Sequence, residues 1–108
     1  MYGMFDFLSM KDNRTERIVD NYNNGECQVD TCYVNDGSHD YETGISHPSY
    51  DYGSWIIVEA YDTRDEAQAG HDKWVKIMQT DPLPEKLTDC HNAKISQLLG
   101  CETEYYRQ

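Results

Sequence analysis

The chain has 108 residues, a mass of 12.6 kDa and a formal net charge of -11, with nine basic and twenty acidic residues. The basic residues are scattered, which argues against direct binding to nucleic acid or to an anionic membrane surface, since both need a basic patch. No apolar run approaches the roughly 18 residues of a membrane span. The length is typical of one domain, so we interpret residues 1–108 as a single domain that needs no metal or disulfide to fold.

The N-terminal segment 1–15 is predicted to be an apolar arm. Four apolar residues fall at the spacing of one helix face: Met1, Met4, Phe5 and Leu8. Gly3 disfavours a helix there, and the alternative is an arm that docks on a partner, either another copy or another protein, with a polar spacer at 11–15. The candidate contact residues in this arm are Met4, Phe5, Phe7 and Leu8. The segment lacks the basic region and cleavage site of a signal peptide, so we expect a reducing compartment, the host cytoplasm.

Alternation of apolar and polar residues predicts about four antiparallel strands. The predicted strands cover residues 17–22, 27–34, 41–47 and 55–61. Asn23-Asn24-Gly25 predicts a hairpin turn, because Asn and Gly tolerate positive φ, and Asn35-Asp36-Gly37 predicts a second turn. Ile56-Ile57-Val58 is apolar on both faces, which favours a central position for the fourth strand.

The clearest local signal is a capping box before a helix that begins near Arg64. Thr63 is placed to accept the backbone N–H of Glu66, and Glu66 to accept the N–H of Thr63. The apolar stripe that should pack on the sheet comprises Ala67, His71, Trp74, Val75 and Met78. Gly70 would let this helix approach the sheet closely.

The last quarter of the chain predicts a second, shorter helix. Thr88 or Asp89 would cap it, and Gly100 would end it. Its buried face would comprise Ile95, Leu98 and Leu99. The tail 102–108 is either a loose end or a final strand. Together the elements predict an α+β fold: a small antiparallel sheet of about four strands, one amphipathic helix packed on it, and a short C-terminal helix.

The sequence shows no motif that points to an enzyme. Cys27 and Cys32 sit at an odd spacing on one predicted strand and so point to opposite faces, while Cys90 and His91 are adjacent and diverge. There is no C-x-x-C, no nucleophile elbow and no glycine-rich phosphate loop. We therefore predict a protein without enzymatic activity, with no metal, no cofactor and no small-molecule substrate.

His71 and the tyrosines each allow two interpretations. His71 is either a general base or pH switch, or a core histidine bonded to a strand carbonyl or a tyrosine; the core interpretation is favoured because buried polar groups usually find a partner. The tyrosine-rich segments either make protein contacts or close over the core as lids. The candidate contact residues in these segments are Tyr50, Asp51, Tyr52, Tyr105 and Tyr106.

One stretch resembles a group of small uncharacterised proteins common in bacteriophage genomes. The resemblance rests on Tyr41-Glu42-Thr43, Trp55-Ile56-Ile57-Val58-Glu59, Thr63-Arg64-Asp65-Glu66-Ala67 and Ala69-Gly70-His71, and it spans about residues 41–78. It implies a phage context, and it carries no activity and no functional residue.

Two functional hypotheses follow. The first is a virion-associated accessory component of the capsid or tail, which acts through protein contacts or self-assembly and ends up in the particle. The alternative is an acidic inhibitor that binds a basic host protein, in the manner of a DNA mimic, for which the charge of -11 is the support.

Overall fold

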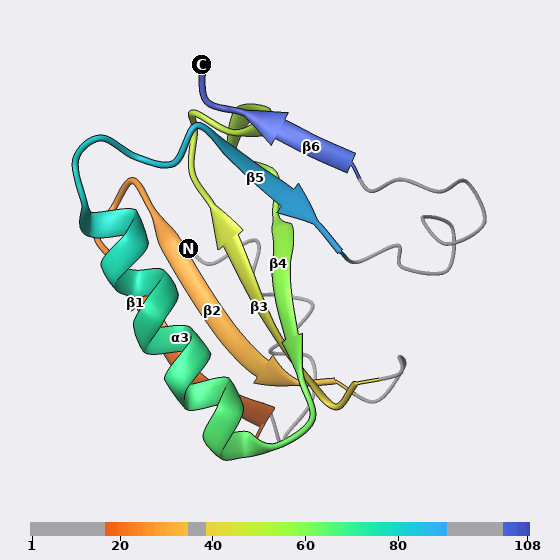
Figure 1. Ribbon diagram of the computed structural model, residues 1–108. Helices are drawn as coiled ribbons and strands as arrows, with labels where there is room; N and C mark the ends of the chain where they lie inside the picture. Colours follow the sequence, from red (N-terminus) through yellow and green to blue (C-terminus); the bar gives the residue numbers. More distant parts are fainter. Residues whose placement is uncertain (1–16, 35–38, 91–102) are drawn as a thin grey trace.

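The computed structural model describes residues 17–34, 39–90 and 103–108. A meander forms a four-stranded antiparallel sheet in the order β1-β2-β3-β4, helix α3 packs on one face of it, and a two-stranded antiparallel sheet follows (Figure 1). The elements are β1 (Ile18–Asn23), β2 (Gln28–Tyr33), β3 (Tyr41–Ser46), β4 (Ile56–Tyr61), α3 (Arg64–Gln79), β5 (Lys86–Asp89) and β6 (Thr103–Tyr106). The predicted α+β fold, with about four strands and one packed helix, is confirmed. The N-terminal arm with Met4, Phe5, Phe7 and Leu8, and the second turn, lie outside the described residues.

The first hairpin turn forms where the sequence predicts it. Gly25 has a φ of 96°, in the left-handed region that glycine adopts without a steric penalty. The Asn24 side chain accepts the backbone N–H of Cys27 at 2.7 Å, and the Asn24 N–H donates to the Cys27 carbonyl at 3.1 Å. These bonds hold the β1–β2 register, which pairs Tyr22 with Val29.

The core lies between the sheet and α3. Val29 pairs with Ile45, and Thr31 with Thr43, on the face that α3 covers, and all four side chains are fully buried. The apolar residues that form the core are Cys27, Val29, Ile45, Tyr50, Ile56, Met78 and Leu87. From the predicted stripe of α3, Ala67, His71 and Met78 are buried, while Trp74 and Val75 pack against the core only partly buried.

The N-terminus of α3 forms the predicted cap, with one change. The Thr63 hydroxyl accepts the N–H of Glu66 at 3.1 Å, as expected. The Glu66 carboxylate, however, accepts the N–H of Asp62 at 3.2 Å, so the predicted return bond to Thr63 is wrong by one residue. The extended backbone of Thr63, with φ -128°, follows Asp62 directly, and the longer Glu side chain reaches past the cap to that N–H.

The position of β4 corrects the prediction of a central strand. β4 is one of the two edge strands of the four-stranded sheet. It is apolar on both faces because the second sheet packs beside it, and the Cys90 N–H donates to the Ile57 carbonyl at 2.8 Å. On the face away from α3, Ile57 lies next to Gly44, where an added Cβ would be 3.3 Å from the Ile57 side chain. Burial at a junction of two sheets gives the same pattern as a central position.

The structure also corrects the predicted start of a second helix. Thr88 and Asp89 are not helix caps but belong to β5, where they pair with Glu104 and Thr103 of β6. The tail is therefore the final strand, one of its two predicted alternatives. The remaining residues assigned to that helix, from Ile95 to Gly100, lie outside the described part of the chain.

Candidate functional site: an aromatic surface

The loop that follows β3 is anchored to the core by Tyr50. Its side chain is 0% exposed, its hydroxyl donates to the Pro84 carbonyl at 2.5 Å, and its ring meets the His47 ring edge-on at 5.7 Å. Burial raises the pKa of this hydroxyl, which keeps it a donor. The prediction that Tyr50 is a contact residue is therefore wrong, because the protein's own core covers its ring completely and leaves none of it for a partner.

The same loop presents Tyr52 to solvent on a strained turn. Asp51, Tyr52 and Gly53 have φ values of 51°, 56° and 90°, so three successive residues are left-handed, and only one of them is glycine. The left-handed conformation costs roughly 1–2 kcal/mol for most non-glycine residues; Asp51 tolerates it better than Tyr52 does, because a short polar side chain can form local hydrogen bonds. The Ser46 hydroxyl, which donates to the Gly53 carbonyl at 2.6 Å, helps to hold the turn. Tyr52 lies at the tip of this turn and is 85% exposed.

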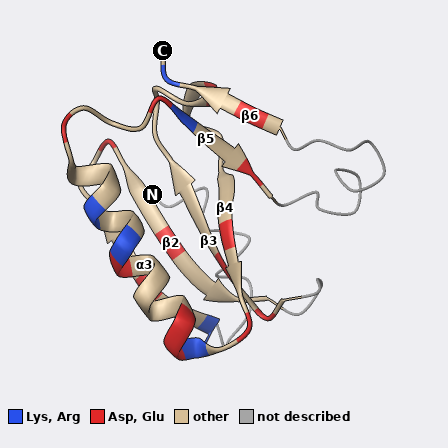
Figure 2. Ribbon diagram, viewed as in Figure 1, with Lys and Arg blue, Asp and Glu red and all other residues tan. Residues whose placement is uncertain are grey.

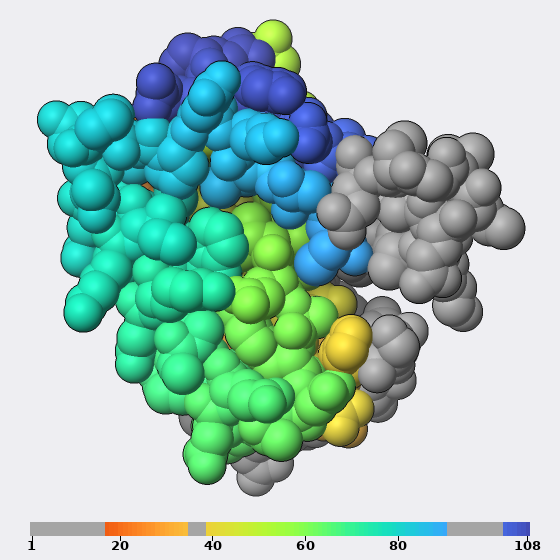
Figure 3. Space-filling model, viewed as in Figure 1, coloured from red at the N-terminus to blue at the C-terminus, as the bar shows by residue number. Residues whose placement is uncertain are grey.

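The C-terminal strand lies beside this turn. The Gln108 N–H donates to the Ser49 carbonyl at 3.0 Å, and the Arg107 N–H donates to the Glu85 carbonyl at 2.7 Å. In Figure 3 the atoms of the last residues, coloured dark blue, adjoin the yellow-green atoms of the loop. Two segments that are about fifty residues apart in the sequence thus form one end of the molecule.

Tyr106 is held on that end by its neighbours. Its hydroxyl donates to the Glu104 carboxylate at 3.0 Å, and the Lys86 ammonium lies 5.8 Å from its ring centre. Lys86 also pairs with Glu104 at 2.7 Å. This hydrogen-bonded ion pair lowers the pKa of Glu104 and raises that of Lys86, so both stay charged at neutral pH. Tyr106 remains 52% exposed.

Tyr105 points the other way along β6, pairs with Leu87 and packs partly buried against the core. Burial raises the pKa of its hydroxyl, and the Asp51 carboxylate raises it further. We define the aromatic surface as Asp51, Tyr52 and Tyr106. The structure therefore places three of the predicted contact residues at one end of the molecule, and it assigns Tyr50 to the core and Tyr105 to a position packed against it. No local sequence pattern indicates the Lys86–Glu104 pair, because the pairing of β5 with β6 joins segments that are distant in the sequence.

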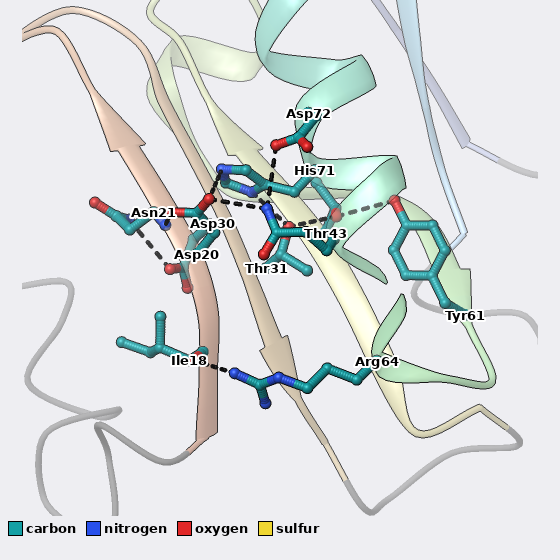
Figure 4. A network of polar contacts seen from close by, with 11 residues as sticks. Ile18, Asp20, Asn21, Asp30, Thr31, Thr43, Tyr61, Arg64, His71 and Asp72 are labelled. Atoms are coloured by element: carbon teal, nitrogen blue, oxygen red, sulfur yellow. Dashed lines mark hydrogen bonds and ion pairs between the residues drawn. The ribbon is translucent and has the colours of Figure 1, made fainter. Parts of the chain in front are cut away.

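A second feature is a polar network buried between α3 and the sheet (Figure 4). The His71 ring is 2% exposed, and its Nδ1 lies 2.8 Å from the Thr31 hydroxyl. The Thr31 and Thr43 hydroxyl oxygens are 2.6 Å apart, and Thr43 lies 3.0 Å from the Tyr61 hydroxyl. His71 is a core histidine, as predicted, but its partner is a threonine hydroxyl rather than a carbonyl or a tyrosine.

On its other side, the His71 ring faces a carboxylate. Its Nε2 lies 3.8 Å from Asp20 Oδ2, which accepts the Gln68 amide at 3.0 Å. Burial lowers the pKa of His71 below its usual value, although Asp20, Asp72 and Asp30 oppose this. The imidazole is thus neutral at pH 7, and the Thr31 hydroxyl is enclosed by partners, so the arrangement offers no accessible nucleophile.

The burial of His71 predicts a loss of stability in mild acid. Its pKa is lower in the folded chain than the unfolded value of about 6.5. The unfolded chain therefore binds a proton first, so the free energy of unfolding falls as the pH drops from about 6.5 through the lower folded pKa. Urea unfolding at several pH values between 5 and 8 measures this slope. His71→Asn keeps a donor near Thr31 and should flatten the slope; an equal slope in both proteins would contradict the assignment.

A cleft of about 440 Å³ lies between β4 and the first half of α3. Its polar lining residues are His39, Glu59, Tyr61, Asp62, Glu66 and Lys73. These groups pair along the wall: His39 with Asp62 at 2.6 Å, and Glu59 with Lys73 at 2.7 Å. Lys73 neutralises Glu59, and the His39 ring is bonded to Asp62, so these two acidic groups already have partners on the wall of the cleft.

Three cysteines among the described residues form no disulfide: Cys27, Cys32 and Cys90. Burial raises the pKa of the Cys27 thiol to about 11, which keeps it protonated and unreactive at neutral pH. Within residues 17–34, 39–90 and 103–108, no three His, Cys, Asp or Glu side chains come together as metal ligands.

Among the described elements there is no helix of the length and hydropathy needed to cross a bilayer. Comparison of the chain with protein-family models, with curated proteins and with solved structures finds no match.

Proposed function

We propose that this protein acts without catalysis, through protein contacts made by the aromatic surface, as a virion-associated component of a bacteriophage capsid or tail. The observation that carries the proposal is the 85% exposure of Tyr52 on a turn of left-handed residues. The phage setting comes from the resemblance of residues 41–78 to small phage proteins.

An exposed tyrosine in a left-handed conformation lowers the stability of the free protein, and burial of its ring does not offset this loss. Strained residues of this kind persist where the surroundings enforce them, and they concentrate at sites of function. A tyrosine on a fixed turn brings a large contact area and loses little conformational entropy on binding. Tyr106, already fixed by Glu104 and Lys86, adds a second ordered ring on the same end of the molecule. A preordered pair of rings suits a static contact in an assembly.

The alternative, an acidic inhibitor of a basic host protein, is supported by the net charge of -11. A DNA mimic should gather its acidic groups on one face. In Figure 2, acidic segments occur on β2, β4, β5, β6 and α3, and basic segments lie among them on α3. This dispersion over the described residues favours the contact protein over the mimic.

The proposal predicts that the aromatic surface is required for incorporation into phage particles. We expect wild-type protein in purified particles, and at least a tenfold loss of it for the double variant Tyr52→Ala/Tyr106→Ala, a large effect for two truncated aromatic anchors. Quantitative mass spectrometry of particles purified from phage that carry each variant measures this. Circular dichroism checks that the variants fold.

Tyr33→Ala is the matched control. Tyr33 is also exposed, at 37%, but it ends β2 at the opposite end of the sheet from β6 (Figure 1). Its incorporation should equal that of the wild type. Absence of the wild-type protein from particles, or full incorporation of the double variant, would overturn the proposal. Absence from particles combined with salt-sensitive binding to a basic host protein would favour the inhibitor instead.

A further inference from the structure

The polar network between α3 and the sheet continues to the surface of β4. The Tyr61 hydroxyl donates to Glu59 Oε1 at 3.2 Å, and the same oxygen accepts Lys73 Nζ at 2.7 Å and Trp74 Nε1 at 2.8 Å. An unbroken chain of contacts thus runs from Glu59 through the Tyr61, Thr43 and Thr31 hydroxyls to Nδ1 of His71. Figure 4 shows the inner part of this chain, from Tyr61 to His71, crossing beneath the helix.

The protonation states of Glu59 and Tyr61 determine which groups of this hydrogen-bond chain can donate. Burial raises the pKa of Glu59, but the bonds from Lys73, Trp74 and Tyr61 outweigh this and hold it below its usual value, so the carboxylate only accepts. Burial raises the pKa of Tyr61 to about 12, so its hydroxyl keeps its hydrogen. Each of the three hydroxyl groups has one hydrogen to donate.

Counting hydrogens gives the chain a direction. Tyr61 donates to Glu59, so Thr43 must donate to Tyr61, and Thr31 must donate to Thr43. The remaining contact, between Thr31 and His71, then has no hydroxyl hydrogen left. That hydrogen has to come from Nδ1 of the imidazole.

We propose that Glu59 acts through three hydroxyl groups to fix His71 as the Nδ1–H tautomer, which leaves Nε2 as a buried proton-accepting position that faces Asp20. Without a proton on Nε2, its lone pair points at the Asp20 carboxylate 3.8 Å away, and the two groups cannot bond. A proton taken up at Nε2 makes the imidazolium donate to Asp20 on one side and to Thr31 on the other. The contact between α3 and the sheet is thereby sensitive to acidification.

The groups that face His71 come from each packed element. Asp20 lies on β1, Asp30 on β2 and Asp72 on α3 itself, and all three carboxylates favour the charged imidazole. β3 contributes the Thr43 hydroxyl, and β4 contributes Tyr61 and Glu59 through the chain. Burial opposes these groups, so Nε2 stays without a proton at neutral pH and takes one up only in acid.

Tyr61→Phe is the decisive variant, because it cuts the chain without leaving a hydroxyl hydrogen unused. Thr43 can then donate to Thr31, and Thr31 to Nδ1, which moves the imidazole hydrogen to Nε2, where Asp20 accepts it. Nitrogen-15 NMR of the histidine rings at pH 8 distinguishes the protonated ring nitrogen from the unprotonated one. We expect Nδ1–H for His71 in the wild type and Nε2–H in Tyr61→Phe, with a lower pKa in the variant because its neutral form is already bonded to Asp20.

Tyr41→Phe is the matched control, since Tyr41 lies opposite Tyr61 in the β3–β4 register but outside the chain. It should keep the Nδ1–H tautomer. The wild-type spectrum alone can overturn the proposal. An Nε2–H tautomer in wild-type His71 would show that Glu59 does not set the direction of hydrogen-bond donation along the three hydroxyl groups. An unchanged tautomer in folded Tyr61→Phe would overturn it equally. Neither measurement depends on the aromatic surface or on particle incorporation.

Discussion

Replacement of Gly70 by alanine is expected to destabilise the protein by roughly 3 kcal/mol, at the upper end of the usual cost of overpacking. A Cβ at this position would lie 2.2 Å from the Tyr61 hydroxyl oxygen and 2.3 Å from two carbons of its ring. The ring cannot turn aside without cost, because its hydroxyl is bonded to Thr43 and Glu59. Urea unfolding of the variant and the wild type measures the difference.

The sign of this effect is the test. By helix propensity alone, alanine in place of glycine should stabilise α3 by about 1 kcal/mol. In a Tyr61→Leu background the clash is relieved, so Gly70→Ala should cost much less there, and the two substitutions should be strongly non-additive. A stabilising Gly70→Ala in the wild-type background would show that α3 does not approach β4 as closely as the structure has it.

The helix was the most predictable element because its signals are local. The Thr63 cap and the apolar stripe depend on residues within four positions of one another. Only the partner of Glu66 was wrong, by one residue, because the reach of a flexible side chain past the cap depends on the backbone angle there.

The sheet was predictable in its strands and less so in its order. Alternation gave the strands of the meander, but a strand that is apolar on both faces has the same pattern at the centre of a sheet and at a junction of two sheets. β4 occupies the junction. β5 was missed for a related reason: residues 90–102 separate it from its partner β6 in the sequence, and Thr and Asp are preferred helix N-cap residues, which favoured a helix start at Thr88 or Asp89.

The candidate site was predictable only as a list of tyrosines. Which of them face solvent depends on contacts between distant segments: Tyr50 with Pro84, and Ser49 with Gln108. The left-handed turn has a faint signal in Gly53, whereas the positive φ of Tyr52 runs against the preference of its residue type. Such disagreement between local preference and observed conformation is expected at functional positions.

The two neighbouring tyrosines of this loop should respond to substitution in opposite directions. Tyr50→Ala removes a fully buried ring and its hydroxyl bond to Pro84, and we expect a loss of about 3–5 kcal/mol, as for other large aromatic truncations in cores. Tyr52→Gly removes an exposed ring from a left-handed position. Relief of the strain outweighs the added flexibility of glycine, so we expect a gain of roughly 0.5–1 kcal/mol.

Tyr33→Gly supplies the comparison for the second substitution. Tyr33 is exposed on a β-strand, where glycine relieves no strain and should cost roughly 0.5–1 kcal/mol. Thermal and urea unfolding of the three variants measure all these differences. A variant Tyr52→Gly that is more stable than the wild type but fails to enter particles would show that the tyrosine is kept at the expense of stability for the contact it makes. A Tyr52→Gly variant that is no more stable than the wild type would show that the turn is not strained. The main support for the aromatic surface as a binding site would then be lost.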